Sequence, residues 1–215
     1  MIKGLIFDLD GVIVNTKRNH FLAWKRIADD LGITFTEKEN EFLKGISRRD
    51  SLLSILELGN ISLKEGKIDE LLKQKNEWYK SSISHLNKLD ILEGVEELLE
   101  EAKNKDISLA IGSSSKNASF ILDKLELTSY FNIIVDGSMV TKPKPNPEVF
   151  KKGADYMNLS PSECIVFEDA ASGVKAAKDG GFRVVAVGNE NIRFMANEYL
   201  NSMKEFNLSE YESIV

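Results

Sequence analysis

Short runs of apolar and β-branched residues recur along the chain, and they predict the strands of one sheet. The runs are "IKGLIFD" near residues 2–8, "ISLAIGS" near 107–113, "FNIIVD" near 131–136, "CIVFED" near 164–169 and "FRVVAVG" near 182–188. Apolar residues at helical spacing predict helices at 94–104, 117–126, 146–157 and 172–179. This alternation of strands and helices is typical of an α/β fold whose mostly parallel sheet is covered by helices on both faces.

Residues 16–87 break the alternation, because they show only helical patterns. The three segments are "NHFLAWKRIADDLG", "SRRDSLLSILELG" and "LKEGKIDELLKQKNEWYK", and Gly32 and Gly59 stand where helix C-terminal caps are expected. The block is longer than a simple crossover between parallel strands requires, so we expect an inserted α-helical cap domain. The expected boundaries are 16–87 for the cap domain, 1–15 and 88–215 for the core domain, and 14–16 and 86–92 for the hinges.

The composition is that of an ordinary globular protein, with 42% hydrophobic residues, 29% charged residues and a net charge of -6. A negative charge gives no reason to expect nucleic-acid binding. Cys164 is the only cysteine, which excludes an intramolecular disulfide and a multi-cysteine metal site, and its apolar neighbours indicate a buried thiol. Asp8 and Asp10 interrupt the first apolar run and no run approaches about 20 residues, so we expect no secretory leader, no membrane helix and a cytoplasmic protein.

Acidic side chains follow two of the predicted strands. Asp8 and Asp10 come at the end of the first strand, and Glu168 and Asp169 at the end of the fourth. Because ligands bind beyond the carboxyl ends of parallel strands, near the point where the strand order reverses, we expect these groups at one site. Oxygen ligands without cysteine or clustered histidine suit a hard cation such as Mg²⁺. Taken alone, Asp169 could instead cap the helix that follows it.

Hydroxyl and ammonium groups follow two other strands. "GSSSKN" forms a strand-to-helix turn that presents N–H groups and hydroxyls to an anion, although Ser113 alone would also fit a helix cap. "TKPKPNP" brings a lysine, Lys142 or Lys144, to the same edge. A lysine there could neutralise an aspartate or a phosphoryl group, whereas in a solvated connector it would be a surface charge.

Together these groups predict phosphoryl transfer. A carboxylate nucleophile can form an aspartyl-phosphate, which divides one difficult displacement into two easier ones. Mg²⁺, a lysine and serine hydroxyls would stabilise the charge on the phosphoryl oxygens. A second carboxyl group, two residues further on, can protonate the leaving oxygen and deprotonate the attacking one.

The motifs "DLDGV", "SSSKN", "KPKPNP" and "FED" resemble the four motifs of the haloacid dehalogenase superfamily, and the helical block resembles its α-helical cap subgroup. The resemblance implies a Rossmann-like core with Asp8 as the nucleophile and Asp10 as the general acid/base. It also implies that Ser113 and Lys142 bind the phosphoryl group. The implied Mg²⁺ ligands are Asp8, Asp10 through its backbone carbonyl, and Asp169, with Glu168 beside them.

The segments "NTKRNHFLAWKRIADDLGI", "LKGISRRDSLLSIL" and "KQKNEWY" resemble the bacterial β-phosphoglucomutase family, and the similarity runs through nearly the whole chain. In that family a threonine and a histidine orient and gate the acid/base, and they match Thr16 and His20. The residues implied to line the sugar pocket are Trp24, Lys44, Gly45, Ser47 and Lys75. Those implied to hold a second phosphate are Arg48, Ser115, Lys116 and Asn117.

Some of these residues have ordinary alternatives, and the chain departs from the family at several positions. Without the resemblance, Trp24 is more typical of a helix core, and Lys75 of a charged helix surface. Arg49 stands where an acidic residue is common, Asn15 stands where an aspartate is common, and Ser114 adds a hydroxyl. None of these departures removes a catalytic group, and Arg49 bears on which second group the cap prefers.

The resemblance implies interconversion of β-D-glucose 1-phosphate and glucose 6-phosphate through an aspartyl-phosphate. β-Glucose 1,6-bisphosphate would be the intermediate and also the primer that phosphorylates the enzyme. A phosphatase of small sugar phosphates with the same fold and a non-catalytic sugar-phosphate binding protein are the alternatives. We expect a small sugar phosphate as the partner, no nucleic acid, no membrane, and a monomer.

Overall fold

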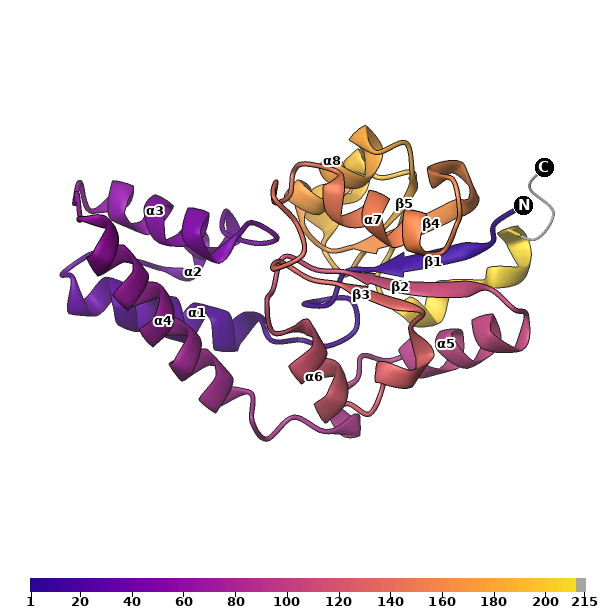
Figure 1. The fold of residues 1–215 in the computed structure, drawn as a ribbon, viewed down its shortest axis with the longest axis horizontal. Helices are drawn as coiled ribbons and strands as arrows, with labels where there is room; N and C mark the ends of the chain where they lie inside the picture. The colour runs from indigo at the N-terminus through magenta and orange to yellow at the C-terminus, as the bar shows by residue number, and fades with distance from the viewer. Residues whose placement is uncertain (212–215) are drawn as a thin grey trace.

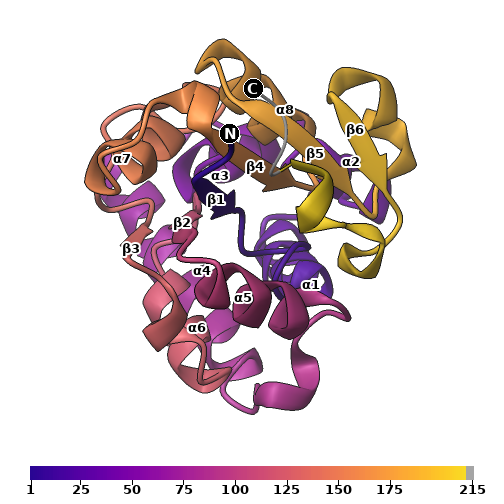
Figure 2. The ribbon, with the colours of Figure 1, turned by 90° about the vertical axis from the view of Figure 1, so that its right-hand side faces the viewer.

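The computed structural model describes residues 1–211, and residues 212–215 of the predicted core domain lie outside the described part. The described strands form one six-stranded sheet in the order β3-β2-β1-β4-β5-β6, with all pairings parallel (Figure 2). The strands are β1 (Gly4–Phe7), β2 (Ser108–Gly112), β3 (Ile133–Val135), β4 (Cys164–Glu168), β5 (Arg183–Val187) and β6 (Glu198–Leu200). The five predicted strands are confirmed, whereas the sequence pattern misses β6, a short edge strand without an apolar run.

The strand order reverses between β1 and β4. From β1 the chain adds β2 and β3 on one side, then crosses over and adds β4, β5 and β6 on the other. Phe7 of β1 pairs with Ile111 on one side and with Phe167 on the other. The C-terminal ends of β1 and β4 therefore lie together at the edge where α/β folds place their ligands.

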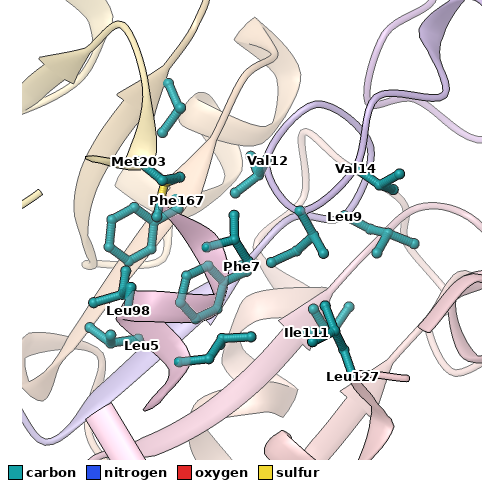
Figure 3. Packing of buried hydrophobic residues seen from close by; sticks show 14 of the residues in the cluster. Leu5, Phe7, Leu9, Val12, Val14, Leu98, Ile111, Leu127, Phe167 and Met203 are labelled. Atoms are coloured by element: carbon teal, nitrogen blue, oxygen red, sulfur yellow. The ribbon is translucent and has the colours of Figure 1, made fainter. Parts of the chain in front are cut away.

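Helices cover both faces of the sheet (Figure 1). They are α5 (Val95–Asn104), α6 (Ala118–Lys124), α7 (Glu148–Tyr156) and α8 (Ala171–Asp179). Leu5 and Phe7 pack with α5 and α6 on one face, and Ile6 packs with α7 and α8 on the other. Phe7 stacks on Phe167 of β4 with 4.8 Å between the ring centroids (Figure 3). Because both faces of β1 are buried, its sequence is continuously apolar.

The four α-helices between β1 and α5 form a group that we call the helical segment, residues 17–82. Its α-helices are α1 (Lys17–Asp30), α2 (Glu37–Glu41), α3 (Arg48–Leu58) and α4 (Glu65–Ser82), and only the short α2 is absent from the predicted pattern. Trp24, Ile55 and Ile68 belong to an apolar cluster separate from the two that flank the sheet. In Figure 1 this segment lies beyond the C-terminal ends of the strands.

The ends of two helices in this segment differ from one another. Gly32 follows α1 with φ at +71°, the left-handed conformation expected of a glycine cap. Gly59 caps α3 with φ at -87°, and Asn60 takes the left-handed conformation instead, with φ at 50°. The backbone conformation therefore favours glycine at Gly32 but not at Gly59.

The two connections between the helical segment and the sheet lie side by side. Val14 makes bridge contacts with Asp10 and with Ile91. Short 3₁₀ helices occupy several loops: η1 (Lys88–Asp90), η2 (Thr128–Tyr130), η3 (Pro161–Glu163), η4 (Glu190–Met195), η5 (Met203–Glu205) and η6 (Leu208–Tyr211). Within residues 1–211, none of the helices has the length and apolar character needed to span a membrane.

Candidate active site

An ammonium group is buried between two carboxylates where β1 and β4 end. Lys144 Nζ donates to Asp8 Oδ1 at 2.6 Å and to Glu168 Oε1 at 2.7 Å, and the lysine side chain is fully buried. Burial lowers the pKa of Lys144, but the two carboxylates raise it further, so that it ends above its usual range. Lys144 therefore stays charged and holds Asp8 in a fixed position.

The prediction that Lys142 is the lysine at this edge is wrong. Lys142 is exposed, and its backbone N–H donates to Glu148 Oε2 at 2.8 Å, at the start of α7. Lys144, two residues further on, is 2% exposed and reaches Asp8. The spacing of "KPKP" allows either lysine to reach the edge. The hydrogen bond between Lys142 N–H and Glu148 fixes the loop on α7 so that Lys144, and not Lys142, reaches Asp8.

Three carboxylates form a group that fits a divalent cation. Oxygens of Asp8, Glu168 and Asp169 lie within 4.8 Å of one another. Glu168 Oε2 accepts hydrogen bonds from the backbone N–H groups of Asp169 and Ala170, both at 2.8 Å, which fixes its orientation. Asp169 Oδ2 is buried, and within residues 1–211 its one close polar partner is the ammonium of Lys17. Three buried carboxylates at one edge suit Mg²⁺, which prefers oxygen ligands.

Asp169 belongs to this group of carboxylates and does not cap the helix that follows it. The N-cap residue of α8 is Ala170, and no side chain makes a capping hydrogen bond there. Asp169 Oδ2 instead lies 2.6 Å from Lys17 Nζ, a contact that the sequence analysis does not predict. Burial raises the pKa of Asp169, and the charge of Lys17 opposes that rise.

The second aspartate has different surroundings from the first. Asp10 Oδ1 accepts a hydrogen bond from Thr16 Oγ1, and Tyr79 OH donates to Thr16 Oγ1 at 3.2 Å. Thr16 occupies the N-cap position of α1 without making a capping bond, so its hydroxyl is free for Asp10. Burial and the charge of Asp8 raise the pKa of Asp10 to about 7. A carboxyl group that titrates near neutral pH can both donate and accept a proton.

His20 of α1 faces the same aspartate. His20 Nε2 lies 3.8 Å from Asp10 Oδ2, and His20 Nδ1 lies 2.9 Å from Lys75 Nζ. Burial and the charges of Lys75 and Arg48 lower the pKa of His20 well below its usual range, so the ring is neutral. When Lys75 carries its proton, Nδ1 accepts from it, and the ring proton lies on Nε2 toward Asp10.

Lys75 is a buried residue of α4 and not part of a charged helix surface. It is 1% exposed, and its Nζ lies 4.6 Å from the ring centroid of Trp24 and 4.7 Å from that of Tyr79. Burial lowers the pKa of Lys75 to about 7. Tyr79 is not among the residues predicted from the sequence, although its position four residues after Lys75 places both on one face of α4.

A cavity of about 770 Å³ lies between the helical segment and the edge of the sheet, a usual size for a small-molecule site. The predicted site residues that line it are Asp8, Asp10, His20, Trp24, Lys44, Gly45, Ser47, Arg48, Lys75, Ser113, Ser115, Lys116 and Asp169. Thr16, Asn117 and Glu168 are buried outside the lining. Asn117 Nδ2 donates to Asn76 Oδ1 of α4 at 3.0 Å, so it links the sheet side to the helical segment.

Arg48 brings a positive charge to the cavity from the first turn of α3. Within the described residues 1–211, no carboxylate lies within ion-pair distance of its guanidinium. Its neighbour Arg49, in contrast, pairs with Glu65 at 2.6 Å and lies 3.8 Å from Asp69. An unpaired guanidinium at a cavity wall suits a phosphate, which it can bind through two parallel hydrogen bonds.

Two serines near the sheet edge hold the loop that precedes α3. Ser114 Oγ donates to the Gly45 carbonyl at 2.7 Å, and Ser172 Oγ donates to the Lys44 carbonyl at 3.0 Å. Gly45 has φ at +73°, and a Cβ there would lie 2.3 Å from Ser172 Oγ. Only glycine fits this close approach. The extra hydroxyl of Ser114 thus joins the sheet side of the cavity to the helical segment.

Removing that hydroxyl is expected to loosen the loop at 44–47. In Ser114→Ala the Gly45 carbonyl loses its donor, and such a hydrogen bond contributes about 1 kcal/mol, or about fivefold in an opening equilibrium. Amide hydrogen exchange at 44–47 should become about fivefold faster. The matched control is Ser119→Ala, because Ser119 is exposed on α6. Unchanged exchange in Ser114→Ala would contradict the role assigned to this hydroxyl.

Comparison with known proteins gives one family and several close relatives. A family model described as haloacid dehalogenase-like hydrolase matches residues 5–187. The chain is 43% identical over 189 residues to a β-phosphoglucomutase of Bacillus subtilis, covering 87% of this chain and 84% of that protein. It is 34% identical over 182 residues to a phosphorylated carbohydrates phosphatase of Thermotoga maritima, covering 84% and 82%. A crystal structure of a β-phosphoglucomutase from Clostridium difficile matches with a TM-score of 0.95 at 38% identity, covering 98% of this chain and 96% of that chain.

Proposed function

The chain belongs to the haloacid dehalogenase-like hydrolase family, and we propose that it is a phosphomutase that interconverts β-D-glucose 1-phosphate and glucose 6-phosphate. The observation that carries the proposal is one cavity with two separate groups suited to phosphate. Asp8 and Lys144 form one at the sheet edge, and the unpaired Arg48 forms the other on the helical segment. A phosphatase needs only the first. The similarity to β-phosphoglucomutases supports the same assignment.

The proposed cycle begins with Asp8 phosphorylated by β-glucose 1,6-bisphosphate as the primer. The 6-hydroxyl oxygen of β-D-glucose 1-phosphate attacks the phosphorus, the bond between phosphorus and the Asp8 oxygen breaks, and the hydroxyl proton passes to Asp10. The β-glucose 1,6-bisphosphate that forms then reverses its orientation. Asp8 attacks the phosphorus at C1, Asp10 returns its proton to the departing C1 oxygen, and glucose 6-phosphate leaves.

The charge that develops on the phosphoryl group needs cationic partners. Lys144 supplies one, because its ammonium already contacts Asp8 Oδ1 at 2.6 Å. Mg²⁺, when bound, would neutralise further charge on the phosphoryl oxygens. Asp8, Asp169 and the backbone carbonyl of Asp10 would hold the cation. Glu168 would hold Lys144 in place, because its oxygens accept hydrogen bonds from Lys144 and from two backbone N–H groups.

Residues of the helical segment contact Asp10, the proposed general acid/base. Tyr79 and His20 reach Asp10 from α4 and α1, and Thr16 reaches it from the connection between the two parts. We therefore propose residues 16–87 as a cap domain that hinges at 14–16 and 86–92 on a core domain formed by 1–15 and 88–215. Closure of the cap on a sugar would set Asp10 for proton transfer, whereas water alone would not bring about closure.

Arg48→Ala is expected to raise KM for β-D-glucose 1-phosphate about a hundredfold. Two charge-assisted hydrogen bonds to the distal phosphate would be lost, at a cost of about 2 to 3 kcal/mol. Steady-state kinetics with Mg²⁺ and a trace of bisphosphate measures this. Arg193→Ala is the matched control, because Arg193 is exposed on η4 and does not line the cavity. Equal kinetics for the two variants would remove Arg48 from the distal phosphate site.

Phosphorus NMR of β-D-glucose 1-phosphate with Mg²⁺ and a trace of bisphosphate tests the whole proposal. We expect glucose 6-phosphate to appear without a matching amount of inorganic phosphate. Hydrolysis of the β anomer without isomerisation would overturn the mutase and favour a phosphatase, the activity named for the Thermotoga maritima relative. A wild-type protein that binds the sugar phosphate and turns nothing over would favour a binding protein.

The setting proposed for the enzyme follows from its charge and its cavity. Its cavity of about 770 Å³ is suited to a small sugar phosphate, and its net charge of -6 does not favour nucleic acid as a partner. We propose that it acts in the cytoplasm as a monomer, which size-exclusion chromatography with light scattering tests.

A further inference from the structure

Lys17 brings a second ammonium group to the carboxylates of the site. It is the first residue of α1, and its Nζ lies 2.6 Å from Asp169 Oδ2, with the lysine side chain 29% exposed and the aspartate side chain 4% exposed. The contact is an ion pair, and the charge of Lys17 opposes the rise that burial causes in the pKa of Asp169. Lys17 therefore lies against a carboxylate that also belongs to the group suited to Mg²⁺.

The backbone leaves a path for this side chain. A Cβ at Gly11 would lie 2.4 Å from Asp169 Oδ2 and 2.6 Å from Lys17 Cε, and Gly11 has φ at +100°. Only glycine is compatible with both the conformation and the contact. Gly11 thus leaves room for Lys17 and Asp169 to meet beside the first loop.

The other cation of the site is already engaged. Lys144 lies between Asp8 and Glu168, so within residues 1–211 Lys17 is the only cation at ion-pair distance from Asp169. Mg²⁺ binds oxygen at about 2.0 to 2.1 Å and demands regular geometry. An ammonium and Mg²⁺ at the same oxygen would repel one another strongly in a site with little water.

We propose that Lys17 and Mg²⁺ compete for Asp169 Oδ2, so that Mg²⁺ binding displaces the Lys17 ammonium and frees the start of α1. The inference rests on the Mg²⁺ site of the proposed function. Thr16, the residue before Lys17, lies in the connection between the sheet and the helical segment and donates to Asp10. Binding of Mg²⁺ would therefore change the position of this connection as well as that of Lys17. In the metal-free protein, Lys17 offsets a charge that would otherwise be unpaired.

Calorimetric titration of the EDTA-treated full chain with MgCl₂ tests the competition. Lys17→Met keeps the length of the side chain and removes its charge, and we expect Mg²⁺ to bind about tenfold more tightly than in the wild type. The matched control is Lys25→Met, which removes a charge from the exposed face of α1, where Lys25 pairs with Asp29. The control should bind Mg²⁺ as the wild type does.

Melting temperatures give a second readout that does not depend on activity. In EDTA, Lys17→Met should melt below the wild type, because Asp169 loses its partner, and Mg²⁺ should raise its melting temperature more than it raises that of the wild type. Lys17→Gln repeats both measurements should the methionine variant fold poorly. Equal or weaker Mg²⁺ binding in the folded Lys17 variant overturns the competition and leaves the mutase proposal intact. A wild type that binds no Mg²⁺ overturns both the metal site and this inference.

Discussion

Replacing Asp8 by asparagine is expected to lower turnover of β-D-glucose 1-phosphate by about ten-thousandfold or more, as the loss of a nucleophile does in other enzymes. The amide cannot accept a phosphoryl group, so the first half of the cycle is lost. Its oxygen can still accept from Lys144 Nζ, which lies 2.6 Å from Asp8 Oδ1, so the fold should remain intact. Coupled assay of glucose 6-phosphate formation measures the loss.

Measuring how tightly Asp8→Asn binds the sugar phosphate distinguishes loss of the nucleophile from loss of the binding site. Calorimetry of Asp8→Asn with β-D-glucose 1-phosphate should give a Kd within about threefold of the wild type, because the distal phosphate contact is unchanged. Asp179→Asn is the control, since Asp179 pairs with Lys175 on the exposed face of α8 at 2.8 Å. Substantial turnover by Asp8→Asn would show that another group is the nucleophile.

Lys144→Met is expected to have the second large effect, on both stability and activity. The ammonium is fully buried between Asp8 and Glu168, at 2.6 and 2.7 Å. Its loss leaves two buried carboxylates without a cationic partner, which should lower the free energy of unfolding by about 3 to 5 kcal/mol in the absence of Mg²⁺. Turnover should fall by about a thousandfold, because a fixed positive charge at the phosphoryl group is lost. Urea denaturation in EDTA and steady-state kinetics measure the two effects.

Two further variants distinguish the electrostatic explanation from simple loss of packing. In the double variant Lys144→Met with Glu168→Gln, one of the unpaired charges is removed, so stability should recover by more than half while activity stays low. Lys142→Met, two residues away and exposed, should behave as the wild type. Full activity in Lys144→Met together with loss of activity in Lys142→Met would show that Lys142, and not Lys144, is the lysine that acts at the sheet edge.

The pattern of apolar runs was enough to predict the architecture that positions the site. Buried parallel strands need apolar residues on both faces, so a continuous run such as that of β1 marks a strand, and the polar residue after it marks the strand's end. Asp8 and Glu168 were predicted at one edge on this basis, and they lie within 4.8 Å of one another together with Asp169. The edge strand β6 was missed because three residues carry no comparable signal.

The helical segment shows where the local pattern is less informative. Helical spacing predicted α1, α3 and α4, but it does not indicate which polar residue of an amphipathic helix is buried. Lys75 lies in a charge-rich stretch of α4 and is nevertheless 1% exposed, because Trp24 and Tyr79 pack around it. Thr16 has the residue type of a helix cap, yet its hydroxyl serves Asp10.

By itself the sequence determined five strands of the sheet, the long helices of the helical segment and the ends of the strands that carry acidic groups, because each depends on the spacing of residues within one run. Only the tertiary structure decided that Lys144 and not Lys142 neutralises Asp8, and that Lys17 reaches Asp169. The physical reason is that a lysine side chain is long and flexible. The position of its ammonium group depends on the carboxylate and the packed surface that it contacts. Both are far away in the sequence, so the residues next to the lysine do not reveal them.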